Sequence, residues 1–263
     1  MTDAFAGRAA FITGAGSGIG RATAVALAKA GCDVAINDLS VRDEPGSTMA
    51  EVRAAGRKAV ACPVDVSDAA GVESQVNRAL RELGRLDFFV SSAVYSDRES
   101  FLSAHLDGFR KTIEVSMMGA YFALRASVNA MIKAGHGGSA VIVSSPHAQI
   151  AFPNCMAYNM AKAANDQMMR TAATELLPHR IRVNSVYPGW TDTPGERKFA
   201  SEETIQQAGA KMPLGRLAQP EEIARAILFL LDPGSGYITG TVMHVDGGLF
   251  LPWWSNRGSQ DGF

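Results

Sequence analysis

The chain has 263 residues, a formal net charge of -1 and 47% hydrophobic residues. This near-neutral charge offers no long-range attraction for nucleic acid or an anionic membrane surface, and we expect neither as a partner. Apolar runs such as AILFLL are too short to span a bilayer, and the N-terminal segment lacks a secretory signal pattern. Cys32, Cys62 and Cys155 form no metal-binding spacing, and their odd number predicts reduced thiols in the cytoplasm.

Short apolar segments alternate with longer amphipathic ones along the chain. The predicted elements are, in order, a strand at 8–13, a helix at 18–31, a strand at 33–38, a helix at 47–56, a strand at 58–65, a helix at 69–84, a strand at 86–92, a helix at 106–134, a strand at 139–145, a helix at 156–177, a strand at 181–188, an irregular segment, a helix at 220–231 and a strand at 241–248. Apolar strands separated by helices indicate a parallel sheet that is covered on both faces. We therefore expect one α/β domain over residues 1–263, a Rossmann fold with a doubly wound parallel sheet.

The last predicted strand is followed by the tail LFLPWWS and a polar end. Two adjacent tryptophans are unfavourable in water, because each buries about 150–250 Å² when it is covered. We expect Trp253 and Trp254 either to help enclose a substrate site or to seal a subunit interface.

The stretch TGAGSGIG lies between the first predicted strand and the first helix. Gly14, Gly18 and Gly20 permit a tight turn and a close approach of the backbone to a pyrophosphate on the helix N-terminus. Ser17 and Ile19 belong to the same turn. The pattern predicts a dinucleotide site, the alternative being a glycine-rich turn without a ligand.

Asp38 ends the second predicted strand, and Leu39 follows it. A carboxylate at this point accepts hydrogen bonds from the ribose hydroxyls of adenosine and repels a 2′-phosphate. The sequence therefore predicts NAD rather than NADP as the cofactor. The alternative is that Asp38 only caps a turn.

From Gly7 to about Gly248 the chain resembles the short-chain dehydrogenase/reductase family, and within it the sugar-oxidising members similar to glucose 1-dehydrogenase. Motifs that carry this resemblance occur in the order TGAGSGIG, Asp65-Val66, Ser145, Tyr158-x-x-x-Lys162, PGWTDT and VDGG. Ser145 precedes Tyr158 by thirteen residues, which is the spacing of the family. Each motif is common when it stands alone, whereas this order and spacing is specific.

The resemblance implies roles for the motif residues. Tyr158 is expected to be the general acid/base, Ser145 to hold the substrate oxygen, and Lys162 to bind the nicotinamide ribose. A phenol has a pKa of ~10, and a neighbouring cation lowers a pKa by about 1–3 units, so Lys162 is expected to favour the tyrosinate. Hydride transfer belongs to the cofactor. Further cofactor contacts implied by the resemblance are Asp65, Val66, Ser92, Ala93, Pro188, Gly189, Thr191 and Thr193.

Two departures from the family pattern stand out. The residues after the fourth strand read SSAV where the family has NNAG, and Val94 resists backbone conformations that glycine permits. The loop is therefore expected to follow another path. Ser116 stands where the family has an active-site Asn, which holds a helix kink whose free carbonyl binds a water. Ser116 either takes over that catalytic role by bonding to backbone or only packs within its helix.

The substrate pocket is expected between the segments around Ser145 and Tyr158 and after Gly189. Candidate substrate residues are His147, Asn154, Trp190, Arg197 and Arg98. This polar set favours a small-molecule substrate with several hydroxyls, a sugar or sugar acid.

The second candidate function is that of a 3-oxoacyl or other ketone reductase. Asp38 disfavours it, because biosynthetic reduction usually uses NADPH. An NAD-binding protein with little catalysis is the third, and the complete Ser145, Tyr158 and Lys162 set argues against it. Family members commonly assemble through the two long helices and the last strand, so a homotetramer is expected.

Overall fold

The computed structural model describes residues 4–198 and 201–252, so the predictions made for Trp253 and Trp254 lie outside the described residues. Within these ranges seven strands form one parallel sheet in the order β3-β2-β1-β4-β5-β6-β7. The strands are β1 (Ala9–Thr13), β2 (Asp33–Asp38), β3 (Ala59–Pro63), β4 (Phe88–Ser91), β5 (Gly138–Val143), β6 (Ile181–Pro188) and β7 (Val242–Val245). The strand order reverses between β1 and β4, where doubly wound sheets bind their ligands. The predicted fold class is confirmed.

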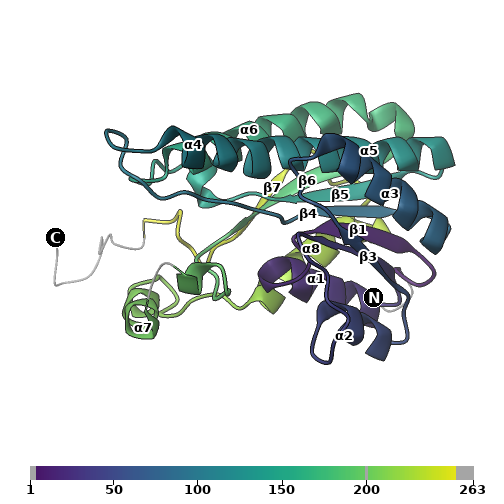
Figure 1. Ribbon diagram of the computed structural model, residues 1–263, viewed down its shortest axis with the longest axis horizontal. Coiled ribbons are helices and arrows are strands. Elements are labelled where there is room, and N and C mark those ends of the chain that lie inside the picture. Colours follow the sequence, from purple (N-terminus) through teal and green to yellow (C-terminus); the bar gives the residue numbers. More distant parts are fainter. Residues whose placement is uncertain (1–3, 199–200, 253–263) are drawn as a thin grey trace.

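Helices cover both faces of the sheet (Figure 1). The α-helices are α1 (Gly18–Lys29), α2 (Thr48–Ala54), α3 (Ala69–Leu83), α4 (Leu106–Ile113), α5 (Gly119–Ala134), α6 (Met156–Glu175), α7 (Glu202–Ala210) and α8 (Pro220–Leu231). Alternate residues of one strand enter different cores: Phe11 packs in a cluster with α3, α5 and α6, and Ile12 in a cluster with α1, α2 and α8. Burial on both faces explains why the central strands are apolar throughout.

Helix ends follow local capping chemistry. The Asp68 carboxylate accepts a hydrogen bond from the Gly71 N–H at 3.0 Å and begins α3. Gly84 ends the same helix at a φ of 81°, a left-handed conformation that glycine adopts readily. These signals are local, so the predicted bounds of α3 agree closely with the observed ones.

Two segments differ from the sequence expectation. The helix expected at 106–134 is interrupted by a π-helical turn, η1 (Glu114–Met118), between α4 and α5. The segment expected to be irregular contains α7, which begins at Ser201, whose side chain accepts a hydrogen bond from the Thr204 N–H. Only two residues of α7 are buried, so its apolar period is too weak to recognise.

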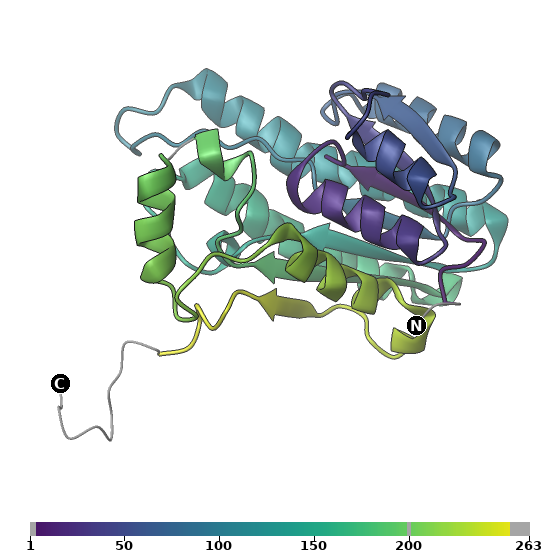
Figure 2. The ribbon, with the colours of Figure 1, turned by 90° about the horizontal axis from the view of Figure 1, so that it is seen from below.

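The carboxyl ends of the strands point toward α7 and the loop that precedes α4, as both ribbon views show (Figures 1 and 2). Residues from the segments after β1, β4, β5 and β6 meet at this edge. Among residues 4–198 and 201–252, no helix is long and apolar enough to cross a membrane. The three cysteines are buried and unpaired.

Candidate active site

The glycine turn leaves no room for side chains. At Gly14, with a φ of 63°, a Cβ would lie 2.7 Å from the backbone of Ala93, and at Gly20 it would lie 2.2 Å from the Gly14 carbonyl oxygen. The Thr13 hydroxyl oxygen accepts hydrogen bonds from the N–H groups of Ser92, at 3.1 Å, and Ala93, at 3.2 Å. The turn and the loop after β4 are thereby held together at the N-terminus of α1, a geometry that fits a pyrophosphate.

The segment after β6 reaches the same turn. A Cβ at Gly18 would lie 3.3 Å from Thr193 Cγ2. The buried Thr191 donates its hydroxyl to the Gly189 carbonyl at 2.9 Å, and a Cβ at Gly189 would lie 2.7 Å from Asp246 Cα. This segment begins at Pro188, the last residue of β6. The structure thus brings two motifs that are far apart in sequence to one place.

Asp38 lies at the other side of the turn. Its Oδ2 accepts a hydrogen bond from the Gly16 N–H at 3.0 Å, and its Oδ1 accepts one from the Leu39 N–H at 2.8 Å. Each carboxylate oxygen has a second lone pair, so both remain able to accept a ribose hydroxyl. Leu39 is 71% exposed, an apolar surface beside this carboxylate that fits the adenine ring.

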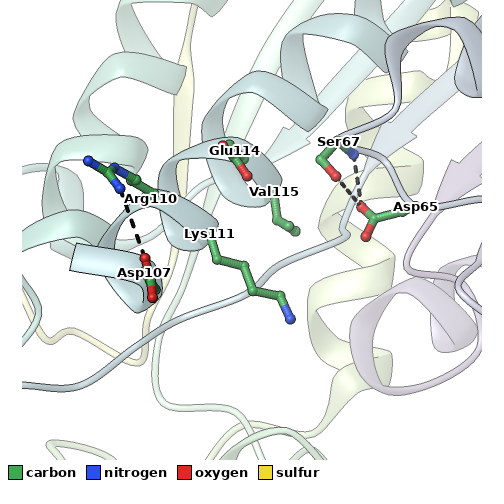
Figure 3. Close-up of a pocket in the computed structure, with 7 residues that line it drawn as sticks. All are labelled: Asp65, Ser67, Asp107, Arg110, Lys111, Glu114 and Val115. Atoms are coloured by element: carbon green, nitrogen blue, oxygen red, sulfur yellow. Dashed lines mark hydrogen bonds and ion pairs between the residues drawn. The ribbon is translucent and has the colours of Figure 1, made fainter. Parts of the chain in front are cut away.

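Asp65 and Val66 follow β3. The Asp65 carboxylate accepts hydrogen bonds from both the N–H and the hydroxyl of Ser67, at 2.9 and 2.7 Å. Val66 is buried against Gly119, where a Cβ would lie 2.5 Å from the valine side chain. A cavity of about 330 Å³ opens beside Asp65 (Figure 3), and its lining consists of Asp65, Ser67, Asp107, Arg110, Lys111, Glu114 and Val115. This lining contains Asp65 but none of the predicted catalytic residues.

Ser145 follows β5, and Tyr158 and Lys162 come from the first two turns of α6. Tyr158 and Ser145 are hydrogen-bonded through their side chains. Lys162 is 4% exposed, donates Nζ to the Val143 carbonyl at 2.7 Å, and lies with Nζ 5.4 Å from the centroid of the Tyr158 ring. The three predicted residues therefore share one location.

The electrostatics of this trio differ from the expectation that Lys162 lowers the pKa of Tyr158. Burial raises the pKa of Tyr158 to about 12, and the hydrogen bond from Ser145 opposes this only in part. Burial likewise lowers the pKa of Lys162 to about 8. Desolvation disfavours the charged forms of both groups and is the largest cause of each shift.

Ser116 lies in the π-helical turn and is buried. Its Oγ accepts a hydrogen bond from the Tyr95 N–H at 2.9 Å and donates one to the Tyr95 carbonyl at 2.6 Å. Its own carbonyl accepts a hydrogen bond from Asn165 Nδ2 at 2.9 Å. Ser116 thus bonds to backbone as expected, but the free carbonyl of the family pattern has a protein partner here.

The loop after β4 accommodates the other departure without strain. Val94 is 54% exposed and is not among the described non-glycine residues with a positive φ. The following residues are fixed to α4 and η1 through Tyr95 and through the Asp97 N–H, which donates to Thr112 Oγ1 at 3.1 Å. The valine therefore faces outward where a glycine is usual in the family.

Of the predicted substrate residues, His147 lies against Tyr158. The His147 ring packs edge-on to the Tyr158 ring, with centroids 4.9 Å apart. Asn154 is exposed and holds a φ of 58°. Trp190 is half-buried, and its buried Nε1 has no hydrogen-bond partner among the described residues.

Two arginines tie the flanking segments together. Arg98 pairs with Glu196 at 2.8 Å, and both charges act on the pKa of Tyr158. Arg197 pairs with Asp192 at 2.8 Å and with Glu202. The guanidinium of Arg197 is thus occupied by two carboxylates and holds the segment before α7.

Sequence reasoning missed four residues of this region: Thr13, Asn159, Asn165 and Glu196. Thr13 and Asn159 stand inside motifs that were recognised, next to Gly14 and Tyr158. Their contacts run to distant segments, so no local pattern marks them.

Comparisons with known proteins agree with this geometry. The profile of the family described as enoyl-(acyl carrier protein) reductase matches residues 14–250. The chain is 37% identical over 246 residues to L-rhamnose 1-dehydrogenase (NAD(P)(+)) of Sphingomonas sp. (strain SKA58), over 93% of this chain and 97% of that protein. It is 36% identical over 249 residues to cis-4-hydroxycyclohexanecarboxylate dehydrogenase of Sinomonas cyclohexanicum, over 94% and 98%.

A solved structure, carveol dehydrogenase from Mycobacterium avium in complex with NAD, superposes with a TM-score of 0.87 at 31% identity and covers 95% of this chain and 100% of that one. The similarity therefore spans the glycine turn, the Ser145-Tyr158-Lys162 site and the last strand together. By these matches the chain is a member of the short-chain dehydrogenase/reductase family of oxidoreductases.

Proposed function

We propose that this protein is an NAD-dependent dehydrogenase that oxidises a hydroxyl group of a polyhydroxylated ring substrate, a sugar or sugar acid. The observation that carries the proposal is the meeting of Ser145, Tyr158 and Lys162 at the edge of the sheet that also holds the glycine turn and Asp38. The relatives named for L-rhamnose and hydroxycyclohexanecarboxylate support a ring alcohol as the substrate.

The residues present fit NAD. Those assigned to it are Gly14, Ser17, Gly18, Ile19 and Gly20 for the pyrophosphate, Asp38, Leu39, Asp65, Val66, Ser92 and Ala93 for adenosine and the adjoining ribose, and Tyr158, Lys162, Pro188, Gly189, Thr191 and Thr193 for the nicotinamide half. When bound in its oxidised form, NAD supplies a hydride acceptor and a positive charge. The contact between Gly16 and Asp38 sets the position of the carboxylate that receives the ribose.

The chain's own residues handle the proton. Ser145 holds the substrate hydroxyl by a hydrogen bond, and Tyr158 Oη removes its proton. Because burial raises the pKa of Tyr158 to about 12, the tyrosinate needs the Ser145 hydrogen bond and nearby positive charge to form at neutral pH. Lys162, with a pKa lowered to about 8, carries that charge at pH 7.

On the substrate side, His147, Asn154 and Trp190 form the wall, and the Arg98–Glu196 pair limits the pocket between the segments after β4 and β6. Arg197 is assigned to the edge of the pocket, where its two carboxylate partners hold it. This surface offers several polar groups, which suits a ring with more than one hydroxyl better than an acyl chain.

A substrate screen tests the proposal. The purified protein is supplied with NAD and a panel of aldoses, sugar acids, polyols and cyclic alcohols, and NADH is followed by its absorbance. Turnover with at least one polyhydroxylated ring, lost in Tyr158→Phe, is expected. Reduction of a 3-oxoacyl thioester with NADPH, together with no oxidation of any sugar, would replace the proposal by a reductase function. Cofactor binding without any turnover would favour a binding role.

We further infer a homotetramer in the cytoplasm. Tyr121 on α5 and Met160 on α6 are exposed large apolar side chains on adjacent long helices, and β7 is an edge strand. Pairing of these surfaces between copies would cover both features. The three buried, unpaired cysteines suit a reducing compartment.

A further inference from the structure

His147 is held from three sides. Its ring stacks on Phe152, with centroids 4.2 Å apart, and meets the Tyr158 ring edge-on. Its backbone N–H donates to Ser145 Oγ at 3.3 Å, and its Nδ1 lies 2.6 Å from Oδ1 of Asn159. The imidazole therefore has one orientation beside the two residues that hold the reacting oxygen.

The partners of Asn159 determine which nitrogen of His147 carries the proton. Asn159 Nδ2 donates to the Phe152 carbonyl at 2.9 Å, and a carbonyl can only accept, so the amide oxygen must face His147. An amide oxygen likewise only accepts, so His147 Nδ1 must be the protonated nitrogen. Burial lowers the pKa of His147, which keeps the ring neutral at pH 7. In a neutral ring protonated at Nδ1, Nε2 is a hydrogen-bond acceptor.

Nε2 of His147 is available. Within residues 4–198 and 201–252 it makes no side-chain hydrogen bond, and it is not among the buried polar atoms without a partner, so it reaches solvent-accessible space. His147 thus presents a hydrogen-bond acceptor to solvent-accessible space, on a ring that contacts Tyr158. A ketone or ether oxygen of a substrate cannot donate to it, whereas a hydroxyl can.

We propose that His147 Nε2 accepts a hydrogen bond from a second substrate hydroxyl, on the carbon next to the one oxidised, and that Asn159 is the positioning residue that fixes His147 for this contact. The neighbouring carbon is part of the proposal: the His147 ring packs edge-on to Tyr158, and the His147 backbone N–H donates to Ser145 Oγ, so the imidazole lies next to both residues assigned to the reacting oxygen. The inference rests on the proposed function, since it names the class of substrate for that same site: vicinal diols.

Binding and turnover are measured separately to test this inference. The Tyr158→Phe protein, saturated with NAD, is titrated by calorimetry with trans-1,2-cyclohexanediol and with 2-methoxycyclohexanol, which lacks the second donor. One neutral hydrogen bond corresponds to roughly 3- to 10-fold in affinity, so the diol is expected to bind tighter than the ether by that factor. The same ratio is measured after adding His147→Phe, Asn159→Leu or the matched control Asn77→Leu, an exposed Asn on α3.

The diol preference is expected to disappear with His147→Phe, which keeps an aromatic ring on Phe152 but has no acceptor. It is expected to fall about 2- to 3-fold with Asn159→Leu, because Nδ1 loses the partner that keeps it protonated, and to persist in Asn77→Leu. No measurable binding of the diol, equal binding of diol and ether, or a preference that survives His147→Phe would overturn the inference. If the preference holds in these titrations while no sugar is oxidised by the unaltered enzyme, the proposed function fails and the inference stands.

Discussion

The N–H of Gly16 donates to Oδ2 of Asp38 over 3.0 Å and joins the glycine turn to the end of β2. A Cβ at Gly16 would lie 2.6 Å from the same oxygen, so a side chain there would displace the carboxylate. The contact places a negative charge within the turn that is assigned to the cofactor. It gives a physical reason to expect that this site discriminates between the two nicotinamide cofactors.

The first prediction concerns this discrimination. NAD is expected to give a higher kcat/KM than NADP, because a hydrogen bond to a charged group contributes about 1.5–3 kcal/mol, or roughly 10- to 100-fold. Asp38→Ala is expected to lower the ratio of kcat/KM with NAD to kcat/KM with NADP. The control Asp43→Ala, at an exposed carboxylate paired with Arg53, is expected to leave this ratio unchanged. Steady-state kinetics with both cofactors at subsaturating concentration provide the measurement. Equal use of NADP by the unaltered protein would contradict the assignment of Asp38.

The second prediction addresses the acid/base. Tyr158→Phe removes the phenolic oxygen and keeps the ring, so kcat is expected to fall by about 10²- to 10⁴-fold while NAD binding stays nearly the same. Tyr121→Phe, on an exposed face of α5, is the matched control. Lys162→Ala is expected to weaken both NAD binding and turnover, since Lys162 is assigned to both. Retention of most of the activity in Tyr158→Phe would exclude this mechanism.

A third prediction follows from the buried lysine. Because the folded protein lowers the pKa of Lys162 to about 8 from an unfolded value of ~10.4, the unfolded chain binds more protons between these values. The free energy of unfolding is therefore expected to rise with pH over this window, relative to Lys162→Met, by at most about 3 kcal/mol.

This difference in the free energy of unfolding is measured by urea denaturation of both proteins, from about pH 7.5 to about pH 10. Comparison with Lys162→Met cancels the titration of groups that do not interact with Lys162; Tyr158, whose ring centroid lies 5.4 Å from Lys162 Nζ, is not one of them. Parallel curves for the two proteins would show that Lys162 titrates normally. Above pH ~10 the raised pKa of Tyr158 acts in the opposite direction, so the measurement stops there.

The fourth prediction concerns the π-helical turn. Ser116→Ala leaves the N–H and carbonyl of Tyr95 without their partner and is expected to destabilise the protein by about 1–3 kcal/mol. Ser127→Ala is the matched control, because Ser127 Oγ is buried on α5 without a hydrogen-bond partner and its loss should be nearly neutral. Denaturant midpoints compare the two variants. An equal effect of both would mean that the Ser116 hydrogen bonds contribute nothing measurable.

The fifth prediction tests assembly. Light scattering at micromolar concentration is expected to give the mass of a tetramer. Introduction of charge on the exposed apolar face, as in Tyr121→Glu with Met160→Glu, is expected to give a smaller species, since burying unpaired carboxylates in an interface is unfavourable. The exposed control Glu73→Lys on α3 should keep the tetramer. A monomer in the unaltered protein would refute the assembly.

Elements with strong local signals were predictable from the sequence. The apolar segment 181–188 and the helix 220–231 have the bounds of β6 and α8, and Asp68 and Gly84 mark the ends of α3. The doubly wound sheet was predicted from the alternation of apolar strands with helices, the family and its oxidoreductase activity from motif order, and NAD from Asp38; all are confirmed. Helix α7 was missed because only Ile205 and Gly209 of it are buried.

What the sequence by itself determined is which residues are candidates for the chemistry: Gly14, Asp38, Ser145, Tyr158 and Lys162 are recognisable because their spacing is a property of the chain. Only the tertiary structure decided the protonation states of these groups and the residues that contact them. Burial sets the pKa of Tyr158 and Lys162, and the acceptor character of His147 depends on Asn159, which in turn depends on the Phe152 carbonyl. Desolvation and hydrogen-bond direction arise between segments that folding brings together, so no one-dimensional pattern contains them.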